Sequence, residues 1–183
     1  VKADGYGHGG PEVAQTLAPF TEQFGVATLN EARAVRVALP DEEILILSPC
    51  LPEEREAAVR EGFIPVVSSA AEAKAYAQLT KVKPVRIHLC IDTGMGRIGV
   101  WQDDAMKTAQ EIAAIDGIKV ESVSTHLPVA ESDADFTAQE LAGWDKLVGQ
   151  LRPILPTAKF HALNSAGSLQ RPEHAADRVR PGL

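Results

Sequence analysis

The 183-residue sequence lacks most features of disulfide-rich, membrane or nucleic-acid-binding proteins. Its two cysteines, Cys50 and Cys90, lie far apart and in no metal-ligand spacing. We interpret both as reduced thiols of a cytoplasmic protein, and we expect no metal site. No apolar run approaches membrane-spanning length, so no membrane partner is predicted. The net charge of -7 argues against a nucleic-acid partner, because neutralising phosphates requires clustered Lys and Arg.

What the sequence does contain is 45 % hydrophobic residues and a regular alternation of short apolar runs with Ala/Glu/Leu-rich stretches. This alternation predicts parallel strands joined by helices, which is the α/β class. Strands are expected at residues 1–3, 24–28, 44–47, 64–67, 85–91, 120–125, 159–163 and at Val179. Helices are expected at residues 12–17, 31–39, 53–60, 71–79, 103–114 and 136–151.

Eight strands in this length predict a compact parallel (β/α)8 barrel of the TIM type, truncated at both ends. An open doubly wound sheet is the alternative fold. It would carry a Gly-rich phosphate fingerprint after its first strand, and residues 5–10, GYGHGG, do not have that pattern. Local signals add predicted helix boundaries: Asn30 and Ser69 as N-caps, and Gly62 as the residue after a helix end.

The run VKADGYGHG at residues 1–9 carries the most chemical information. The β-prone start predicts that Lys2 ends a buried strand, where desolvation favours the neutral amine that attacks an aldehyde. The glycines let backbone and the Tyr6 phenol approach whatever the lysine holds. A surface lysine before a Gly-rich turn explains this segment alone equally well.

Polar side chains also follow the later predicted strands, at the barrel end where enzymes of this fold build active sites. Each of these groups has a structural explanation on its own, but five of them on one rim indicate a functional site. They are Lys2 with Tyr6, residues 92–97 (DTGMGR), Thr125 with His126, His161 with Asn164 and Ser165, and residues 180–182 (RPG).

Two of these segments resemble signatures of a known family. Residues 1–9 resemble the pyridoxal-phosphate lysine signature of alanine racemases, and residues 91–99, IDTGMGRIG, resemble their second signature. Segments 124–127, 161–165 and 179–182 match the remaining motifs in order. The resemblance runs the whole length, and it implies that residues 1–183 form the pyridoxal-phosphate-binding barrel domain, without the family's C-terminal β-domain.

The resemblance also implies roles for individual residues. Lys2 would bond to the pyridoxal 5'-phosphate aldehyde and act as a base, Arg97 would reach the cofactor oxygen and the substrate carboxylate, and His126 would lie against the ring. Arg180 would face the pyridine nitrogen, with His161 bracing it from behind. The remaining cofactor-binding residues, mostly around the phosphate, would be Tyr6, Asn164, Ser165, Gly182 and Leu183.

Two departures from the family pattern stand out. Cys90 occupies the position seven before Arg97 where much of the family has a carbamylated lysine, and a thiol cannot form that carbamate. The family's opposite-face tyrosine base belongs to the C-terminal domain of the partner subunit, and this sequence contains no candidate for it. We therefore expect the 183-residue chain alone to be inactive or nearly so.

The resemblance implies a racemase that interconverts L- and D-alanine by a two-base mechanism, supplying D-alanine for peptidoglycan. Its substrate would be a small amino acid, and the full-length enzyme would be a homodimer. Two alternatives stay open: a racemase of other or broader specificity, such as serine, and a single-domain protein that binds pyridoxal phosphate without turnover.

Overall fold

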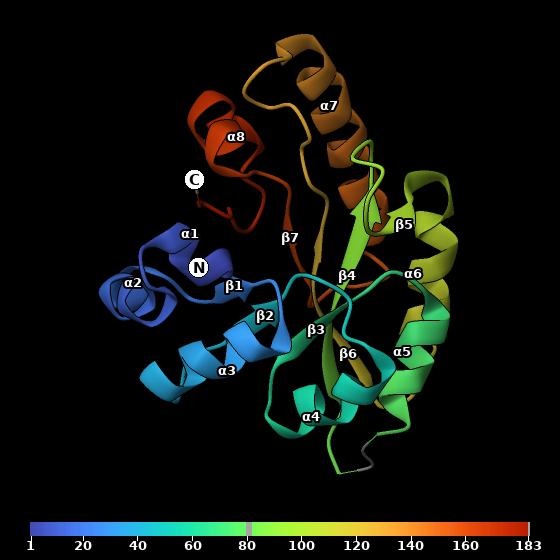
Figure 1. Ribbon diagram of the computed structural model, residues 1–183. Helices are drawn as coiled ribbons and strands as arrows, with labels where there is room; N and C mark the ends of the chain where they lie inside the picture. Colours follow the sequence, from blue (N-terminus) through green and yellow to red (C-terminus); the bar gives the residue numbers. More distant parts are fainter. Residues whose placement is uncertain (80–81, 183) are drawn as a thin grey trace. The chain divides into compact units, whose positions relative to one another are not determined.

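The computed structural model describes residues 1–79 and 82–182 and has strands and helices in alternation (Figure 1). The chain forms two compact units, Val1–Val66 and Val67–Leu183. In the described part of the chain, no helix has the length and apolar character needed to cross a membrane.

The first unit contains three parallel strands with helices between them. Phe24 pairs with Ile44 between the first two strands, and Leu45 pairs with Ile64 between the next two. The elements are α1 (Lys2–Gly7), α2 (Gly10–Leu17), η1 (Ala18–Phe20), β1 (Phe24–Val26), α3 (Leu29–Ala38), β2 (Ile44–Ile46), η2 (Pro52–Glu54), α4 (Arg55–Arg60) and β3 (Ile64–Val67), whose last residue begins the second unit.

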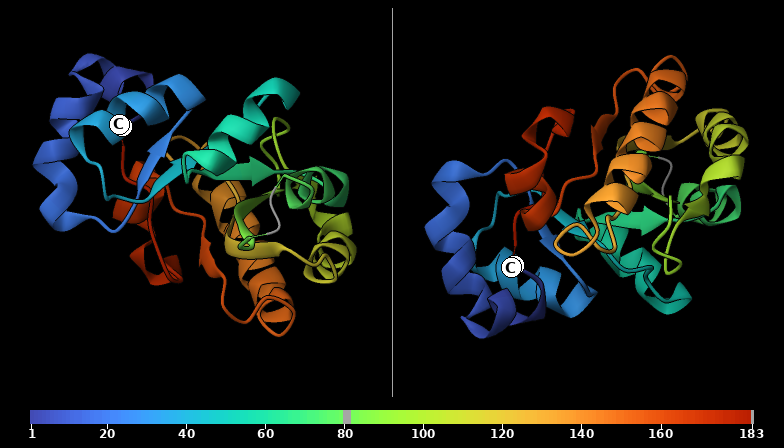
Figure 2. Two further views of the ribbon diagram at one scale, coloured as in Figure 1. Left: turned by 90° about the horizontal axis from the view of Figure 1, so that it is seen from below. Right: turned by 90° about the horizontal axis from the view of Figure 1, so that it is seen from above.

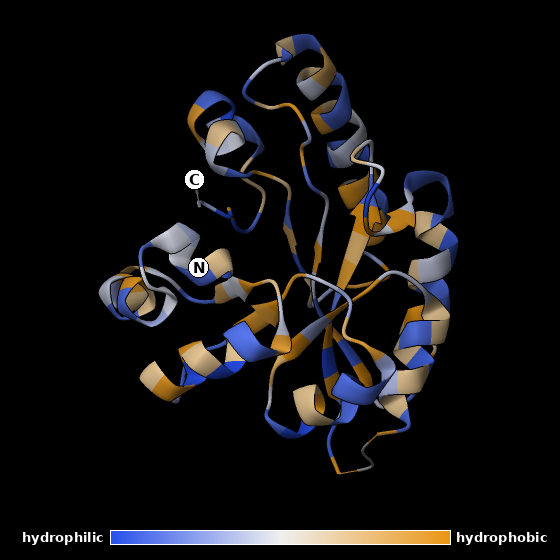
Figure 3. Ribbon diagram, viewed as in Figure 1, coloured by the Kyte–Doolittle hydropathy of each residue, from blue (hydrophilic) through white to orange (hydrophobic). Residues whose placement is uncertain are grey.

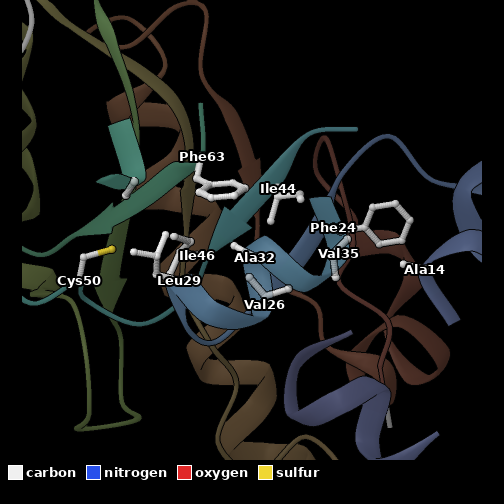
Figure 4. Close-up of a cluster of buried hydrophobic side chains, with 11 residues drawn as sticks. Ala14, Phe24, Val26, Leu29, Ala32, Val35, Ile44, Ile46, Cys50 and Phe63 are labelled. Atoms are coloured by element: carbon white, nitrogen blue, oxygen red, sulfur yellow. The ribbon is translucent and has the colours of Figure 1, made fainter. Parts of the chain in front are cut away.

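A cluster of apolar side chains forms the core of this unit (Figure 4). β1 and β2 contribute Phe24, Val26, Ile44 and Ile46, which are at most 3 % exposed. Helix α3 contributes three side chains at three-residue spacing, Leu29, Ala32 and Val35. Burying such side chains is the main favourable contribution to folding, at roughly 1.5–3 kcal/mol for each large one.

The N-cap of α3 differs from the prediction of Asn30. The helix begins at Leu29 because the Thr28 hydroxyl accepts a hydrogen bond from the Glu31 amide at 3.2 Å. The Glu31 carboxylate in turn accepts hydrogen bonds from the amides of Ala27 and Thr28, at 2.6 and 3.3 Å. A capping box of this kind satisfies donors at both sides of the boundary, which fixes the start of the helix two residues earlier than predicted.

Among its described residues, the second unit has three parallel strand pairings that involve β4 to β7. β4 pairs with β6, β6 pairs with β7, and the short β5 pairs with the end of β4. The elements are α5 (Ala70–Ala77), β4 (Val85–Asp92), β5 (Val100–Trp101), η3 (Gln102–Asp104), α6 (Ala105–Ala113), β6 (Ile118–Ser124), α7 (Ala134–Leu151), β7 (Lys159–His161), α8 (Ser165–Gln170) and η4 (Pro172–His174).

Helices of the second unit cover its strands. α5 contacts β4 and β6, α6 contacts β6, and α6 and α7 lie side by side (Figure 2). Apolar residues make up most of β4 and both residues of β5, while β6, β7 and the helices mix apolar and polar residues (Figure 3). The distribution in β4 fits a strand that is buried on both faces, as the strands of parallel sheets are.

Two predicted strands are wrong. Residues 1–3 belong to a left-handed turn rather than a strand, and Val179 lies in irregular chain. Conversely, β5 and α8 were not predicted. The N-cap at Ser69 is confirmed, since its hydroxyl accepts from the Glu72 amide, and so is Gly62, which follows α4 with a φ of 77°.

Candidate active site

Lys2 and Tyr6 are brought together by the left-handed turn in the first unit. Ala3, Asp4, Gly5 and Tyr6 all have φ between 52 and 60° and ψ between 36 and 50°. Such a conformation costs roughly 1–2 kcal/mol per non-glycine residue, so it requires support from outside the turn. The Ala3 amide donates to Glu31 Oε1 at 3.0 Å, and Asp4 Oδ1 accepts from the Gly10 amide at 2.8 Å.

This turn places Lys2 Nζ 4.8 Å from the centroid of the Tyr6 ring. The lysine is exposed, whereas the sequence predicted a strand end buried enough to desolvate the amine. That part of the prediction is wrong, because the glycine-rich turn coils the chain within two residues and keeps the side chain at the surface of its unit. The proximity of amine and phenol is nevertheless what a shared ligand of both groups would need.

In the second unit, the loop after β4 is organised by one carboxylate. Asp92 Oδ1 accepts hydrogen bonds from the amides of Gly94 and Gly96 at 2.9 and 3.0 Å, and Oδ2 accepts from the Arg97 amide at 3.0 Å. Burial raises the pKa of this carboxyl, but the backbone donors outweigh burial, so the pKa is lowered and Asp92 is ionised at neutral pH. The hydrogen bond to Asp92 therefore holds the backbone of Arg97 in place, while the Arg97 side chain is exposed.

The return of the loop to β5 depends on Gly99. Its φ is 130°, and a Cβ there would lie 2.7 Å from the Asp92 nitrogen and 2.8 Å from the Ile91 carbonyl carbon. We expect Gly99→Ala to lower the free energy of unfolding by about 1–3 kcal/mol, since backbone must move to admit the methyl group. Urea denaturation measures this.

Gly143→Ala is the matched control for Gly99→Ala. Gly143 lies inside α7 with nothing within 4 Å of an added Cβ. Alanine there should leave stability unchanged or raise it by about 0.5–1 kcal/mol, because glycine is unfavourable within helices. Equal effects of the two substitutions would contradict the close approach at Gly99.

Cys90 supports the same loop from β4. Its Sγ donates to the carbonyl oxygen of Ile98 at 3.4 Å. Burial raises the pKa of the thiol to about 11, so Cys90 is uncharged at neutral pH. The residue at this position therefore contributes a neutral contact with the loop backbone rather than a negative charge beside Arg97.

Arg180 is held by four acceptors at the ends of β6 and β7. Its Nη2 donates to the carbonyl oxygens of Thr125 at 2.6 Å and Ala162 at 2.9 Å. Its Nη1 donates to the His161 carbonyl oxygen at 3.0 Å and to His161 Nδ1. Burial lowers the pKa of Arg180 to about 10, so the group remains a cation at neutral pH.

His161 and His88 form a buried, uncharged layer beneath Arg180. Their ring centroids are 5.2 Å apart, and both side chains are at most 2 % exposed. His88 bridges the hydroxyls of Ser122 and Ser124, at 2.7 and 2.8 Å. The pKa of His88 is lowered to about 3, and that of His161 lies well below its ordinary value. Burial is the larger cause in both residues, and the positive charge of Arg180 is the next. Both histidines are therefore uncharged at neutral pH, and the positive charge next to them belongs to Arg180.

The predicted phosphate-binding residues of the second unit also lie together. Asn164 is the N-cap of α8, where its Oδ1 accepts from the Gly167 amide at 2.9 Å. Ser165 begins the helix, and its Oγ accepts from the Gly182 amide at 2.8 Å. His126 follows β6 and is half-buried. Leu183, which the resemblance includes in this set, lies outside the described residues.

The structure thus joins some of the predicted residues by direct contacts, whereas no described contact links the Arg97 side chain to the others. Lys2 and Tyr6 form a pair in the first unit; Arg180 with His161, and Ser165 with Gly182, are joined in the second. The sequence interpretation missed His88 and Glu140, which are buried polar residues of the second unit. His88 had a visible signal, since it is the histidine inside the apolar run at residues 85–91.

Comparison with known proteins identifies the family. The family described as alanine racemase, N-terminal domain, matches residues 1–183. The alanine racemases of Carboxydothermus hydrogenoformans and Treponema pallidum are each 36 % identical to the chain and align with all of it, over 51 and 52 % of their own lengths.

Solved structures agree with this match. The alanine racemase of Clostridium difficile in complex with cycloserine superposes with a TM-score of 0.92 at 26 % identity, covering 100 % of this chain and 52 % of that one. The alanine racemase of Bartonella henselae with covalently bound pyridoxal phosphate gives 0.87 at 26 % identity, covering 100 and 53 %.

The parallel strands and covering helices define an α/β domain of the TIM-barrel type, as the sequence predicted. The chain belongs to the alanine racemase N-terminal domain family. It spans about half the length of the curated relatives it matches.

Proposed function

We propose that the chain is the pyridoxal-phosphate-binding barrel domain of a cytoplasmic enzyme that interconverts L- and D-alanine. The observation that carries the proposal concerns Arg180, which is half-buried. Most N–H groups of its guanidinium donate hydrogen bonds to fixed acceptors of the protein. Its four Nη hydrogens serve His161, Thr125 and Ala162, which leaves Nε–H as the donor of the guanidinium outside this set.

The donor chemistry of Arg180 fits a pyridine ring. An arginine can donate a hydrogen bond to a ring nitrogen but does not give up its proton, since even the lowered pKa of about 10 leaves it charged. The neutral histidines behind it supply no acid either. A ring held by Arg180 would therefore stay unprotonated, which limits electron withdrawal and suits racemisation better than decarboxylation or transamination.

The other residues fit the remaining parts of the same group. The hydroxyl of Ser165 and the amide of Gly182, which already contact each other, are of the type that holds a phosphate, together with the Tyr6 phenol and Asn164. Lys2 would bond to the aldehyde. When bound, pyridoxal phosphate supplies the electron-withdrawing system that acidifies the substrate Cα hydrogen.

The chain's own groups would then act on the substrate. The Lys2 amine would remove or return the Cα proton on one face, and Arg97 would bind the carboxylate from its loop. His126 would lie beside the ring. Racemisation also requires an acid–base group on the opposite face, which we assign to a tyrosine of the partner subunit in a homodimer.

A racemase of broader specificity, such as serine, is the second candidate. In the proposed role Arg97 would bind the substrate carboxylate, a group that all amino acids share, so this contact is compatible with side chains other than that of alanine. A cofactor-binding protein without turnover would use the same residues but would not exchange the Cα hydrogen.

The test is to treat the natural full-length protein with pyridoxal phosphate and then with borohydride, and to locate the label by peptide mass. We expect the pyridoxyl group on Lys2 and, before reduction, formation of D-alanine from L-alanine with exchange of the Cα hydrogen for solvent deuterium. Label without exchange would establish cofactor binding alone. Label on a different lysine would contradict the assignment.

A further inference from the structure

A buried carboxyl group on α7 is not used by the proposed chemistry. Glu140 is 7 % exposed, and its Oε1 accepts a hydrogen bond from the Thr93 hydroxyl at 2.6 Å. Its second oxygen, Oε2, is buried and has no hydrogen-bond partner among the described residues. An ionised carboxylate with one bare buried oxygen is far more costly than the uncharged acid of the same shape.

Glu140 belongs to a chain of hydrogen bonds that joins three elements. Because the single Thr93 hydrogen goes to Glu140, the Thr125 hydroxyl donates to Thr93 Oγ1, at 2.7 Å. Thr93 follows Asp92 at the end of β4, and Thr125 follows β6. The Thr125 carbonyl oxygen is also one of the acceptors that hold Arg180. The chain therefore runs from α7 to both strand ends that carry the candidate active site.

The helix also packs directly on the turn that leads to Arg97. A Cβ added at Gly94 would lie 3.2 Å from Phe136 Cζ and 3.5 Å from Glu140 Oε1. Phe136 and Glu140 lie one turn apart on α7. Movement of this part of α7 would thus be transmitted to residues 92–97.

We propose that Glu140 is a positioning residue, which holds the loop of residues 92–99, and with it Arg97, through Thr93 as long as its carboxyl is uncharged. The charged group of β4 that acts on Glu140 is Asp92, whose carboxylate repels a second negative charge. From the end of β6, the uncharged Thr125 contacts Thr93. The role of Arg97 towards substrate rests on the proposed function, but the positioning of the loop does not.

The electrostatics agree with this arrangement. Burial raises the pKa of Glu140 from its ordinary value of 4.5, the Thr93 hydrogen bond opposes the rise, and the Asp92 charge adds to it. A carboxyl whose pKa is higher in the folded chain than in the unfolded chain contributes stability below the unfolded value, and this is lost as pH rises through the folded value. Raising the pH through the folded value should therefore weaken the wild-type loop.

The first experiment measures the loop itself in the wild-type protein at full length. Hydrogen-exchange protection factors of the Gly94, Gly96 and Arg97 amides, which all donate to Asp92, are followed from pH 4, below the ordinary pKa of a glutamate, to pH 9. We expect protection to fall by about 10-fold or more as Glu140 ionises, because local opening becomes easier. Constant protection of these amides across the range would overturn the proposal.

The second experiment uses Glu140→Gln, which keeps the shape and fixes the uncharged state. The melting temperature of the variant minus that of wild type should become more positive as pH rises, by about 2–4 °C or more. Glu111→Gln is the control, because Glu111 is a half-exposed glutamate on α6. The difference in melting temperature between Glu111→Gln and wild type should not increase in the same way as pH rises. A pH-independent difference for Glu140→Gln would contradict the proposal.

Kinetics connect the loop to substrate. In Glu140→Ala, which removes the acceptor of Thr93, KM for alanine should rise about 10- to 100-fold with a smaller change in kcat, since Arg97 is displaced. Glu140→Gln should restore KM. Equal kinetics of Glu140→Ala and wild type would remove the positioning role. If wild type does not racemise alanine, the proposed function fails, while exchange and melting still decide the role of Glu140.

Discussion

Replacing Lys2 with alanine is expected to lower kcat/KM for alanine racemisation by at least about 10³-fold, in the protein at its natural length. The methyl group of alanine can neither bond to the aldehyde of pyridoxal phosphate nor carry a proton to and from Cα. Both roles fall on one amine in the proposed function, so their loss occurs together. The borohydride-dependent label should disappear from the peptide at the same time.

Stability should change little in Lys2→Ala. The side chain is exposed, and its described contact is with the Tyr6 ring at 4.8 Å. Losing an exposed cation–π contact costs about 0.5–1 kcal/mol, which a melting curve would show as a small shift. Lys146→Ala, at an exposed lysine on α7, is the matched control and should keep full activity. Undiminished turnover or label in Lys2→Ala would show that a different amine serves the cofactor.

Sequence reasoning worked where apolar runs dominate. The strands at residues 24–26, 44–46, 64–67 and 85–92 were found within two residues, because each run is buried on both faces and has no competing local signal. The same reasoning correctly placed residues 92–97, Thr125 and His161 at strand ends, whereas the strands predicted before Lys2 and Arg180 are absent. The site residues that came from the resemblance, such as Arg180 and Ser165, lie in a common group in the second unit.

It failed where tertiary hydrogen bonds override local preference. Ala3 and Tyr6 are poor candidates for left-handed backbone, and the sequence alone gives no reason to expect it. One support of the turn is Glu31, 28 residues away from Ala3, which accepts a hydrogen bond from the Ala3 amide. Val179 has a β-branched side chain, yet its neighbour Arg180 fixes this segment through side-chain bonds to three carbonyls, which no strand pattern encodes.

Glu140 could have been found from spacing. The buried positions of α7 follow at three- and four-residue steps through Thr137, Leu141, Trp144 and Val148, and Glu140 falls on that face. An acid on the buried face of a helix is a candidate for a special environment. What the sequence could not give is its partner, because Thr93 lies 47 residues away.

Removing the Arg180 guanidinium is expected to have the largest effect on stability. Arg180→Ala leaves the carbonyl oxygens of Thr125, His161 and Ala162, and His161 Nδ1, without this donor. Since the arginine is half-buried, water replaces part of the loss, and we expect a decrease of about 2–4 kcal/mol in the free energy of unfolding. Racemisation should fall as well, because the ring nitrogen loses its donor.

The pKa of His161 distinguishes loss of this particular cation from general damage. Burial is the largest cause of its lowered pKa and the Arg180 charge is the next, so Arg180→Ala should raise the pKa while burial keeps it below 6.5. Histidine NMR titration measures this in wild type, Arg180→Ala and Arg180→Lys.

The lysine variant retains the charge without the planar donor geometry, so it should keep the pKa of His161 low yet still lose stability. Arg60→Ala, at an arginine whose side chain is 68 % exposed, should change neither quantity. An unchanged His161 pKa in Arg180→Ala, or stability equal to that of Arg60→Ala, would show that Arg180 does not hold the ends of β6 and β7 in solution.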